Sequence, residues 1–355
     1  MVCVKLGKRH VGLSQPCYIV FEGGGTHSGL EVAKQLVKVA VDSGADAVKF
    51  QFVDSDRLYH NKNIQIKYST PTGDKVGNRY EMSKKRMMSI DEWKELIAYC
   101  KELNITFFST ACFPQDVDFL VEQGAAAIKI NAGDSNHYYL IDYASRKGVP
   151  IILDGRARYD ELAKGVEICE YNGNKDIIIM HCPPGYPAKN SQVNLNVIRT
   201  LTEIYRYPIG FCDHSLGKIM NYPAIILGAC ILEKTITLDK RTESIEHYMS
   251  LEPSEAKEFI KDIRAIEESL GSGREIFNSR VGVNGKRSIV AKRDIRQGEA
   301  LRLEDLNFKR PGTHLSASRY LEVIGKIAKR DLKENEFIMF NDLEDNEIKN
   351  EFNKF

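Results

Sequence analysis

Polar side chains stand at the ends of several apolar runs in this sequence, and their types suit chemistry on an anionic substrate. They are Glu22, Lys49, Gln51, Thr110, Lys129, Asp134, Asp154, His181, Tyr186, Asp213, His214 and Glu233. Two of them, Lys49 in AVKFQF and Lys129 in AAIKI, lie inside apolar runs. An ammonium buried without an anionic partner is costly. Two such lysines therefore indicate either a catalytic amine or a ligand that carries a carboxylate or phosphate.

The apolar runs that carry these residues recur along the chain and alternate with helical patterns. We expect eight strands, at 17–22, 46–52, 105–110, 126–130, 150–154, 176–180, 207–211 and 229–232. Continuous apolar strands separated by helices predict a parallel sheet covered on both faces. Eight such units favour a (β/α)8 TIM barrel, whose catalytic groups lie at the carboxyl ends of the strands. The alternative is an open doubly wound sheet, but Glu22-Gly-Gly-Gly-Thr-His27 does not match its GxGxxG turn.

The helices expected between these strands have apolar residues at helical spacing. One starts after the capping box Ser89-Ile-Asp-Glu92, and another has apolar Ile219, Tyr222, Ile225 and Ile226 and ends at Gly228. The others cover about 30–44, 114–123, 137–147, 159–170, 193–205 and 255–270. The polar stretch 53–88 shows no clear period, and loops of that length are usually functional or mobile.

The pattern changes to short strands from Ser288 onward, with an internal repeat. The segments IVAKRDIRQGEALRLEDL (289–306) and KIAKRDLKENEFIMFNDLE (326–344) share AKRD, a turn and an apolar–acidic end. The repeat predicts a small pseudo-symmetric β domain. We therefore divide the chain into a barrel domain at 1–280, a linker at 281–287, a β-rich domain at 288–345 and a tail at 346–355.

Composition excludes several classes of protein. The net charge of +1 does not indicate nucleic acid or an anionic membrane surface as a partner. No apolar run approaches the roughly 20 residues of a membrane-spanning helix, and the N-terminus lacks the apolar core of a signal peptide. The eight cysteines form no CxxC pair and mostly lie in apolar runs, which indicates reduced thiols in a soluble cytoplasmic protein.

Seven ordered segments resemble the sialic acid synthase family. They are GADAVKFQ, FFSTACF, IKINAGD, HCPPGYP, IGFCDHSLG, LEKTITLD and HYMSLEP. KRPGTHLS (309–316) and the AKRD repeat resemble the family's C-terminal antifreeze-like (SAF) domain, so the resemblance covers about residues 16–344. It implies a TIM barrel that condenses phosphoenolpyruvate with an N-acyl amino sugar aldehyde, releases phosphate and gives a nonulosonic acid. It also implies a divalent metal, Mn or Mg, and a domain-swapped homodimer whose small domains cover the partner's active site.

The resemblance assigns roles to individual residues of this chain. Lys49, Thr110 and Lys129 match residues that hold phosphoenolpyruvate, and Glu22 matches an acid/base group. Asp134 and Tyr186 match sugar-side positions, and His214 matches one of two metal-binding histidines. Glu246 stands where the family has aspartate and is a further candidate for substrate binding. Arg310 matches the small-domain arginine that reaches the sugar's N-acyl group.

Several positions depart from the family pattern. Ala132 and Asp154 stand where the family has serine, Pro184 stands at a usual polar ligand position, and Thr235 replaces the second metal histidine. The family's SDHT is Cys212-Asp-His-Ser215. A carboxylate beside a phosphate is repulsive unless a cation lies between them. One account is that Asp154 replaces the lost histidine as a metal ligand, since Mn and Mg favour oxygen. The other is that the donor is not phosphoenolpyruvate or that catalysis is lost, in which case Asp154 is expected to pair with Arg156, Arg158 or Lys129.

Two functions stay open on the sequence alone. The first is a nonulosonic acid synthase, supported by the retained lysines, Glu22, His214 and Arg310. The second is a barrel that has lost or changed this chemistry and binds a sugar or sugar acid, or acts as a structural partner, as Ala132, Pro184 and Thr235 suggest. Three weaker features carry simpler alternatives: Gly23–Gly25 as a flexible turn, His27 and His247 as loop histidines, and Cys182 and Cys212 as packed thiols rather than nucleophiles.

Overall fold

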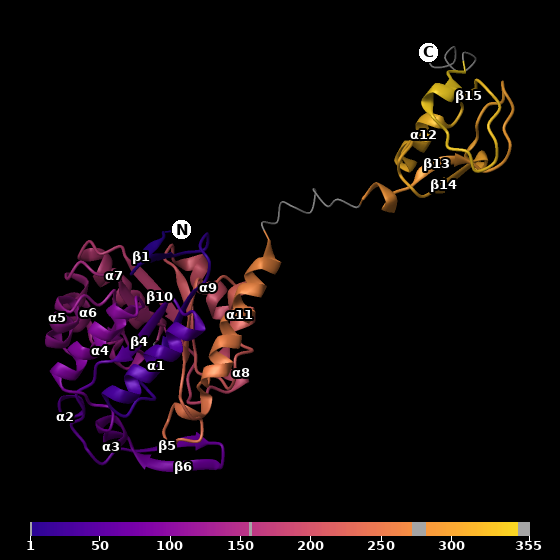
Figure 1. The fold of residues 1–355 in the computed structure, drawn as a ribbon. Helices are drawn as coiled ribbons and strands as arrows, with labels where there is room; N and C mark the ends of the chain where they lie inside the picture. Colours follow the sequence, from indigo (N-terminus) through magenta and orange to yellow (C-terminus); the bar gives the residue numbers. More distant parts are fainter. Residues whose placement is uncertain (1, 156–157, 272–281, 347–355) are drawn as a thin grey trace. The chain divides into compact units, whose positions relative to one another are not determined.

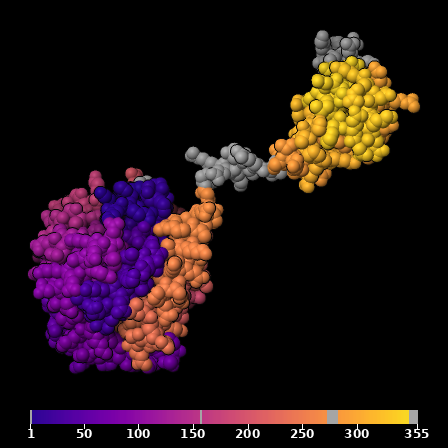
Figure 2. All heavy atoms as spheres, in the orientation of Figure 1, coloured from indigo at the N-terminus to yellow at the C-terminus, as the bar shows by residue number. Residues whose placement is uncertain are grey.

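The computed structural model describes residues 2–155, 158–271 and 282–346. The chain divides into two compact units, Met1–Leu270 and Gly271–Phe355. The larger unit has strands at its centre and helices around them, and the smaller unit is rich in short strands (Figure 1; the packed atoms are drawn in Figure 2). In the part of the chain that the structure describes, no helix is both long and apolar enough to cross a membrane.

Eight parallel strands close into a barrel, which confirms the predicted fold. The barrel order is β10-β11-β12-β3-β4-β7-β8-β9. Their bounds are β3 Tyr18–Glu22, β4 Ala47–Gln51, β7 Thr106–Thr110, β8 Ile128–Ile130, β9 Ile151–Asp154, β10 Ile177–His181, β11 Ile209–Asp213 and β12 Ile231–Thr235. Because the strands are parallel, their carboxyl ends form one rim.

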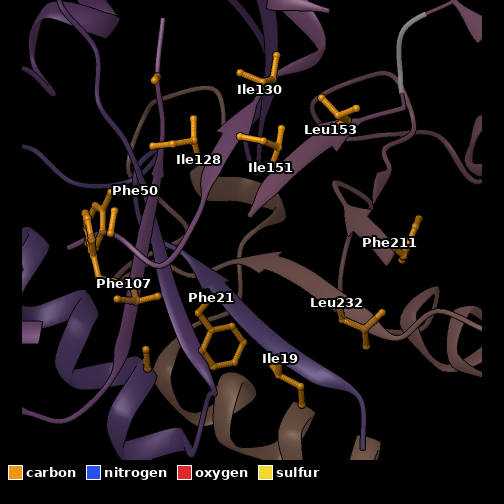
Figure 3. Packing of buried hydrophobic residues seen from close by; sticks show 14 of the residues in the cluster. Ile19, Phe21, Phe50, Phe107, Ile128, Ile130, Ile151, Leu153, Phe211 and Leu232 are labelled. Atoms are coloured by element: carbon orange, nitrogen blue, oxygen red, sulfur yellow. The ribbon is translucent and has the colours of Figure 1, made fainter. Parts of the chain in front are cut away.

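Alternation along each strand decides which side chains reach the barrel interior. Ile19 and Phe21 of β3 belong to the core between strands and helices, together with the other residues shown in Figure 3. Successive side chains of a strand point to opposite faces. Glu22, next to Phe21, therefore points into the barrel. By the same alternation Lys49 points inward, because Val48 and Phe50 belong to the outer core.

Helices cover the outside of the barrel close to the predicted positions. They are α1 Leu30–Ser43, α4 Ile90–Glu102, α5 Pro114–Glu122, α6 Tyr138–Ser145, α7 Tyr159–Tyr171, α8 Asn190–Val193, α9 Asn196–Ile204, α10 Asn221–Ile226 and α11 Pro253–Leu270. The capping box before α4 is present: Ser89 accepts from the Glu92 backbone N–H, and the Glu92 carboxylate accepts from the Ser89 backbone N–H at 2.7 Å. The helix predicted before Gly228 is shorter than expected, and its Ile219 and Ile226 are 67% and 64% exposed.

Two strands extend further toward the rim than their apolar runs suggested. The strand predicted at 207–211 is β11, which ends at Asp213, and the strand predicted at 229–232 is β12, which ends at Thr235. Polar residues continue these strands because the barrel still pairs their backbones, with Cys212 opposite Glu233 and Asp213 opposite Lys234.

The long segment 53–88 is ordered, and the absence of a pattern there was misleading. It contains α2 Ser55–Leu58, the antiparallel pair β5 Gln65–Thr70 and β6 Gly73–Asn78, and α3 Arg79–Lys84. The hairpin is not part of the barrel sheet and buries few of its side chains, Tyr68 and Thr70 among them. A two-sided polar ribbon gives no apolar alternation to detect. A second hairpin, β1 Val4–Leu6 with β2 Arg9–Val11, packs Val4, Leu6 and Val11 against the amino-terminal end of the barrel interior.

The smaller unit has the internal two-fold repeat that the sequence predicted. Its elements are η4 Val283–Gly285, β13 Ser288–Ala291, η5 Leu303–Asp305, β14 Leu306–Lys309, η6 Ala317–Arg319, α12 Tyr320–Val323, β15 Ile327–Ala328, η7 Phe340–Asp342 and β16 Leu343–Glu344. β13 pairs with β14, and β15 pairs with β16. In one copy Arg293 Nε donates to Asp305 at 2.8 Å, and in the other Arg330 Nε donates to Asp342 at 2.8 Å. The repeated AKRD thus supplies the arginine of the same ion pair twice.

The predicted domain bounds fall near this division. The predicted linker, 281–287, includes η4 from residue 283, and its first residue lies outside the described residues, as do residues 347–355 of the predicted tail.

Candidate active site

A cavity of about 760 Å³ opens at the carboxyl ends of the barrel strands. Most of the residues singled out in the barrel sequence line it: Glu22, Lys49, Gln51, Lys129, Asp134, Asp154, Tyr186, His214, Glu233 and Glu246. They come from strands that are far apart in the chain. The cavity is therefore the convergence point that the barrel prediction required.

Two buried lysines and two buried glutamates form the floor of the cavity. Lys129 Nζ lies 2.8 Å from both carboxylate oxygens of Glu233. Lys49 Nζ lies 3.0 Å from Glu233 Oε1 and also contacts Glu22. All four residues are at most 3% exposed. Glu233 is thus shared by both lysines, a role that the sequence analysis did not assign to it.

The electrostatics of this cluster favour an anion. Burial would lower the pKa of Lys49, but Glu22 and Glu233 outweigh burial and raise it. Burial would raise the pKa of Glu233, but Lys129 and Lys49 outweigh burial and hold this pKa below its ordinary value. For Glu22, burial raises the pKa to about 7, with Lys49 acting in the opposite direction. Near neutral pH the lysines therefore carry two positive charges against one full and one partial negative charge.

Thr110 supplies a buried hydroxyl next to this cluster. It ends β7 directly opposite Lys129 in the sheet register. Its Oγ1 is buried and has no hydrogen-bond partner among the described residues. Buried polar atoms are normally paired, so an orphaned hydroxyl beside Lys129 indicates a position that a ligand oxygen completes.

The glycines after Glu22 allow two acidic side chains to approach the backbone. A Cβ on Gly24 would lie 2.5 Å from Glu22 Oε1, and a Cβ on Gly25 would lie 2.0 Å from Glu246 Oε2. Gly25 N also donates to Glu22 Oε1 at 3.2 Å. Glycine is needed at these two positions because Glu22 and Glu246 come too close to the backbone to leave room for a Cβ.

Asp213 and Lys234 point away from the barrel interior and hold the rim together. Their side chains pair at 2.8 Å with both fully buried. Asp213 also accepts from the Ser215 backbone and hydroxyl and, at 2.6 Å, from Asn221 Nδ2. Lys234 donates to the Ser215 carbonyl at 2.6 Å. The network fixes the backbone on both sides of His214 and so orients its imidazole into the cavity.

The outer wall of the cavity combines Asp134, Tyr186 and the segment 53–88. Burial raises the pKa of Asp134, with His137 acting against it. The Tyr186 ring stacks on His214 with centroids 4.6 Å apart. From the segment 53–88, Ile66 and Arg86 reach the cavity, and Arg86 donates to the Gly24 carbonyl at 3.2 Å. This wall therefore presents a carboxyl group, a guanidinium and an aromatic ring to the cavity.

Several candidates lie off the cavity. His181 contacts the Val193 carbonyl at 2.7 Å on the outer side of β10. His247 is buried against the Thr237 hydroxyl at 2.7 Å, and burial lowers its pKa to about 4. Burial also lowers the pKa of His27 to about 4. Arg310 belongs to the smaller unit, where it is exposed, so its predicted role toward the sugar stays a prediction.

Asp154 lines the cavity near Lys129. Its charge helps to raise the pKa of Lys129, after the effects of Cys212 and Glu233 and against burial. Arg158, one of the cations that could have balanced it, pairs instead with Asp160 at 3.0 Å. The other, Arg156, lies outside the described residues. Metal binding by Asp154 stays a prediction.

Among the described residues, one group of three side chains could hold a metal ion: Cys182, Cys212 and His214. Their ligand atoms all lie within 4.8 Å of one another. Mn and Mg prefer oxygen ligands, so either ion would need a further donor such as Asp154 in addition to His214. The sequence had left both thiols without a base partner, and the structure places His214 beside each of them.

Comparison with known proteins identifies the family to which this arrangement belongs. Residues 36–275 match the NeuB family, and residues 286–344 match the SAF domain. The chain belongs to the NeuB family. The resemblance to sialic acid synthases and their C-terminal domain is thereby confirmed.

Three similar proteins match between 79% and 96% of this chain. An uncharacterised protein of Methanocaldococcus jannaschii is 38% identical over 346 residues, 96% of this chain and 98% of the relative. The N,N'-diacetyllegionaminic acid synthase of Campylobacter jejuni is 36% identical over 327 residues, 90% of this chain and 98% of the relative. The crystal structure of the sialic acid synthetase of Leptospira borgpetersenii in complex with citrate has a TM-score of 0.69 and 28% identity, and the match covers 79% of this chain and 96% of that one.

The raised pKa of Glu22 makes a prediction for this NeuB-family barrel. A carboxyl whose pKa rises on folding stabilises the fold at low pH, and the stabilisation is lost as pH rises through the folded pKa, here about 7. From the ordinary glutamate pKa of 4.5, the effect amounts to about 3 kcal/mol between pH 4.5 and 8. We expect Glu22→Gln to lose this pH dependence. Thermal unfolding of both proteins from pH 5 to 8 checks it, and parallel curves would contradict it.

Proposed function

We propose that this chain is a nonulosonic acid synthase that condenses phosphoenolpyruvate with an N-acyl amino sugar aldehyde. The observation that carries the proposal is the buried pair Lys49 and Lys129 at the floor of a rim cavity, beside the orphaned Thr110 hydroxyl. Relatives named as legionaminic acid synthases support the reaction class. The relative solved with citrate bound accepts a carboxylate-rich ligand.

The residues of the cavity floor suit an anionic three-carbon donor. The two ammonium groups would exchange their contacts with Glu233 for contacts with the carboxylate and phosphate of phosphoenolpyruvate. The Thr110 hydroxyl would donate a hydrogen bond to a ligand oxygen. In the reaction a bond forms between the enol methylene carbon and the aldehyde carbon, one water is consumed and phosphate leaves. Glu22, whose pKa is raised to about 7 by burial, can hold or release a proton at neutral pH.

The outer wall suits the sugar. Asp134, Tyr186 and Glu246 line the part of the cavity that also contains Ile66 and Arg86 from the segment 53–88. These groups would bind sugar hydroxyls and the acyl group. A divalent cation held by His214 and Asp154 would polarise the aldehyde carbonyl.

The direct test is phosphate release from phosphoenolpyruvate with a panel of N-acyl hexosamines and Mn²⁺. Sugar-dependent phosphate release, with the nonulosonic acid seen by mass spectrometry, is the expected result. Absence of release with every sugar and metal tested would favour the alternative, a barrel that binds a sugar or sugar acid, or acts as a structural partner. Ala132, Pro184 and Thr235, which depart from the family pattern, are the residues that favour that alternative.

The Mn²⁺ affinity of an Asp154 variant distinguishes these two functions by a second measurement. We expect Asp154→Ser to weaken Mn²⁺ binding about 10-fold, because Mn²⁺ loses an oxygen ligand beside His214. Mn²⁺ titration followed by electron paramagnetic resonance measures the affinity, with and without phosphoenolpyruvate. Asp160→Ser, which removes an exposed carboxylate paired with Arg158, is the matched control. Equal Mn²⁺ affinity in wild type and Asp154→Ser would refute the ligand assignment.

We further propose a domain-swapped homodimer in the cytoplasm. The smaller unit has a core of few residues, Ile289, Ile295, Val323 and Leu332 among them, and docking on a partner would stabilise it. Light scattering is expected to give a dimer at micromolar concentration, and a clean monomer would count against it. Mixing Glu22→Gln with Arg310→Ala is expected to restore part of the activity that each lacks, because a mixed dimer then contains one site with both native residues.

A further inference from the structure

Two cysteines lie close together inside the barrel: Cys182 directly follows β10, and Cys212 belongs to β11 and lines the cavity. The register of β10 and β11 pairs Met180 with Gly210 and His181 with Phe211, so the next pair is Cys182 and Cys212. Both thiols belong to the cluster inside the barrel. His214 lies two residues beyond Cys212, on the same inward-facing side of the chain, and lines the cavity.

The distances among the three side chains suit a tetrahedral metal centre. Cys212 Sγ lies 3.5 Å from His214 Nε2, and Cys182 Sγ lies 3.9 Å from His214 Nδ1. Tetrahedral Zn²⁺, with bonds of about 2.3 Å to sulfur and about 2.0 Å to nitrogen, separates those ligand atoms by roughly 3.5 Å. Small rotations of the side chains would therefore bring one imidazole nitrogen and both sulfurs onto a common ion.

The surroundings of these thiols differ from those of ordinary packed cysteines. Cys100 and Cys169 lie in the outer apolar core between helices and strands. Cys212, in contrast, lies 3.8 Å from Lys129 Nζ and 3.3 Å from Glu233 Oε1. Packing alone does not call for two thiols and an imidazole at the polar mouth of a barrel.

We propose that Cys182, Cys212 and His214 form a binding site for one thiophilic divalent cation of the Zn²⁺ class, with its fourth position open to the cavity. Three protein ligands and an open position are the arrangement of catalytic rather than structural zinc sites. Binding breaks two S–H bonds and releases two protons to solvent, so the two thiolates offset the charge of the ion. The proposal rests on this set of ligands and does not depend on the condensation reaction.

The choice of metal follows from the chemistry of the ligands. Two sulfurs and a nitrogen are soft or borderline donors, which select zinc-like ions over Mn²⁺ and Mg²⁺. We expect Zn²⁺ to bind at least about 100-fold more tightly than Mn²⁺. Two alternative metal sites would then share His214 at the mouth of the barrel. The Mn²⁺ site that includes Asp154 would have the lower affinity of the two.

The test titrates Cd²⁺ and Co²⁺ into the reduced, chelator-treated full-length protein. The expected result is one Cd²⁺ per chain with thiolate-to-cadmium charge-transfer absorption, and a tetrahedral Co²⁺ visible spectrum. Cys182→Ser and Cys212→Ser are each expected to weaken binding at least about 100-fold and to remove most of the charge-transfer band. Cys230→Ser, a buried thiol before β12 at the other end of the barrel, is the matched control and should bind as wild type does.

A second measurement needs no variant. Zn²⁺ is expected to protect Cys182 and Cys212, and not exposed Cys3, from alkylation mapped by peptide mass spectrometry. The proposal is overturned if wild type shows no thiolate charge transfer with Cd²⁺, if the band survives in the double variant, or if Zn²⁺ protects neither thiol. These readouts need no phosphoenolpyruvate, so a failure of the metal site and a failure of the synthase proposal are told apart.

Discussion

Replacement of Lys129 by methionine is expected to lower turnover with phosphoenolpyruvate by about 1,000-fold or more. Lys129 is 1% exposed and lies at the cavity floor, where low exposure to water makes its charge count most. A preorganised charge aimed at a reacting anion typically contributes two to three orders of magnitude to the rate. Methionine has a similar volume and no charge, so the effect measured is that of the ammonium.

Steady-state phosphate release at saturating sugar measures this effect. Lys164→Met, on the exposed face of α7 with a surface partner in Glu167, is the control and should retain wild-type turnover. The variant keeps the Lys49–Glu233 ion pair, so its melting temperature should fall by only a few degrees. Turnover above a tenth of wild type in Lys129→Met would mean that this lysine is structural and that the donor site lies elsewhere.

The inward orientation of the two lysines was predictable because it depends only on their neighbours in the sequence. Lys49 and Lys129 each have apolar neighbours on both sides, and period-two alternation then requires the lysine to point to the face opposite those neighbours. The same rule explains why Glu22 faces the cavity. The fold followed from eight repeats of one pattern, which no single misplaced boundary could change.

The inward orientation of Glu233 could not be predicted from its sequence neighbours. The apolar run before it ends at Leu232, so we placed the end of the strand there, although β12 continues to Thr235. Glu233 and Lys234 look alike as the polar end of a strand. Only the register with β11 shows that Glu233 points inward to two lysines while Lys234 pairs outward with Asp213.

Contacts that join distant strands were out of reach for the same reason. The approach of Cys182 to His214 depends on how β10 and β11 are staggered, and the sequence does not contain that stagger in any local pattern. The hairpin β5–β6 was missed because most of its side chains are polar on both faces. Local periodicity thus predicts which face a residue takes, and long-range register decides which residues meet.

Replacement of Glu233 by glutamine is expected to be the most destabilising single change at the site. Glu233 accepts from both Lys49 and Lys129 while it is 3% exposed. Removing one partner from a buried ion pair leaves an uncompensated charge, at a cost of about 3 to 5 kcal/mol. Here Lys49 would keep only Glu22 and Lys129 would lose its ion-pair partner, so we expect the melting temperature to fall by about 10 °C.

Anions provide the decisive comparison for this variant. Inorganic phosphate or phosphoenolpyruvate can take the place of the missing carboxylate between the lysines, so either should raise the melting temperature of Glu233→Gln more than that of wild type. Glu246→Gln, which lines the same cavity and has no ion pair among the described residues, is the control and should show neither the loss nor the enhanced rescue. A melting temperature of Glu233→Gln within about 2 °C of wild type would mean that the two lysines are neutral or hydrated in the variant. The positively charged cavity floor on which the proposed anion binding depends would then not exist.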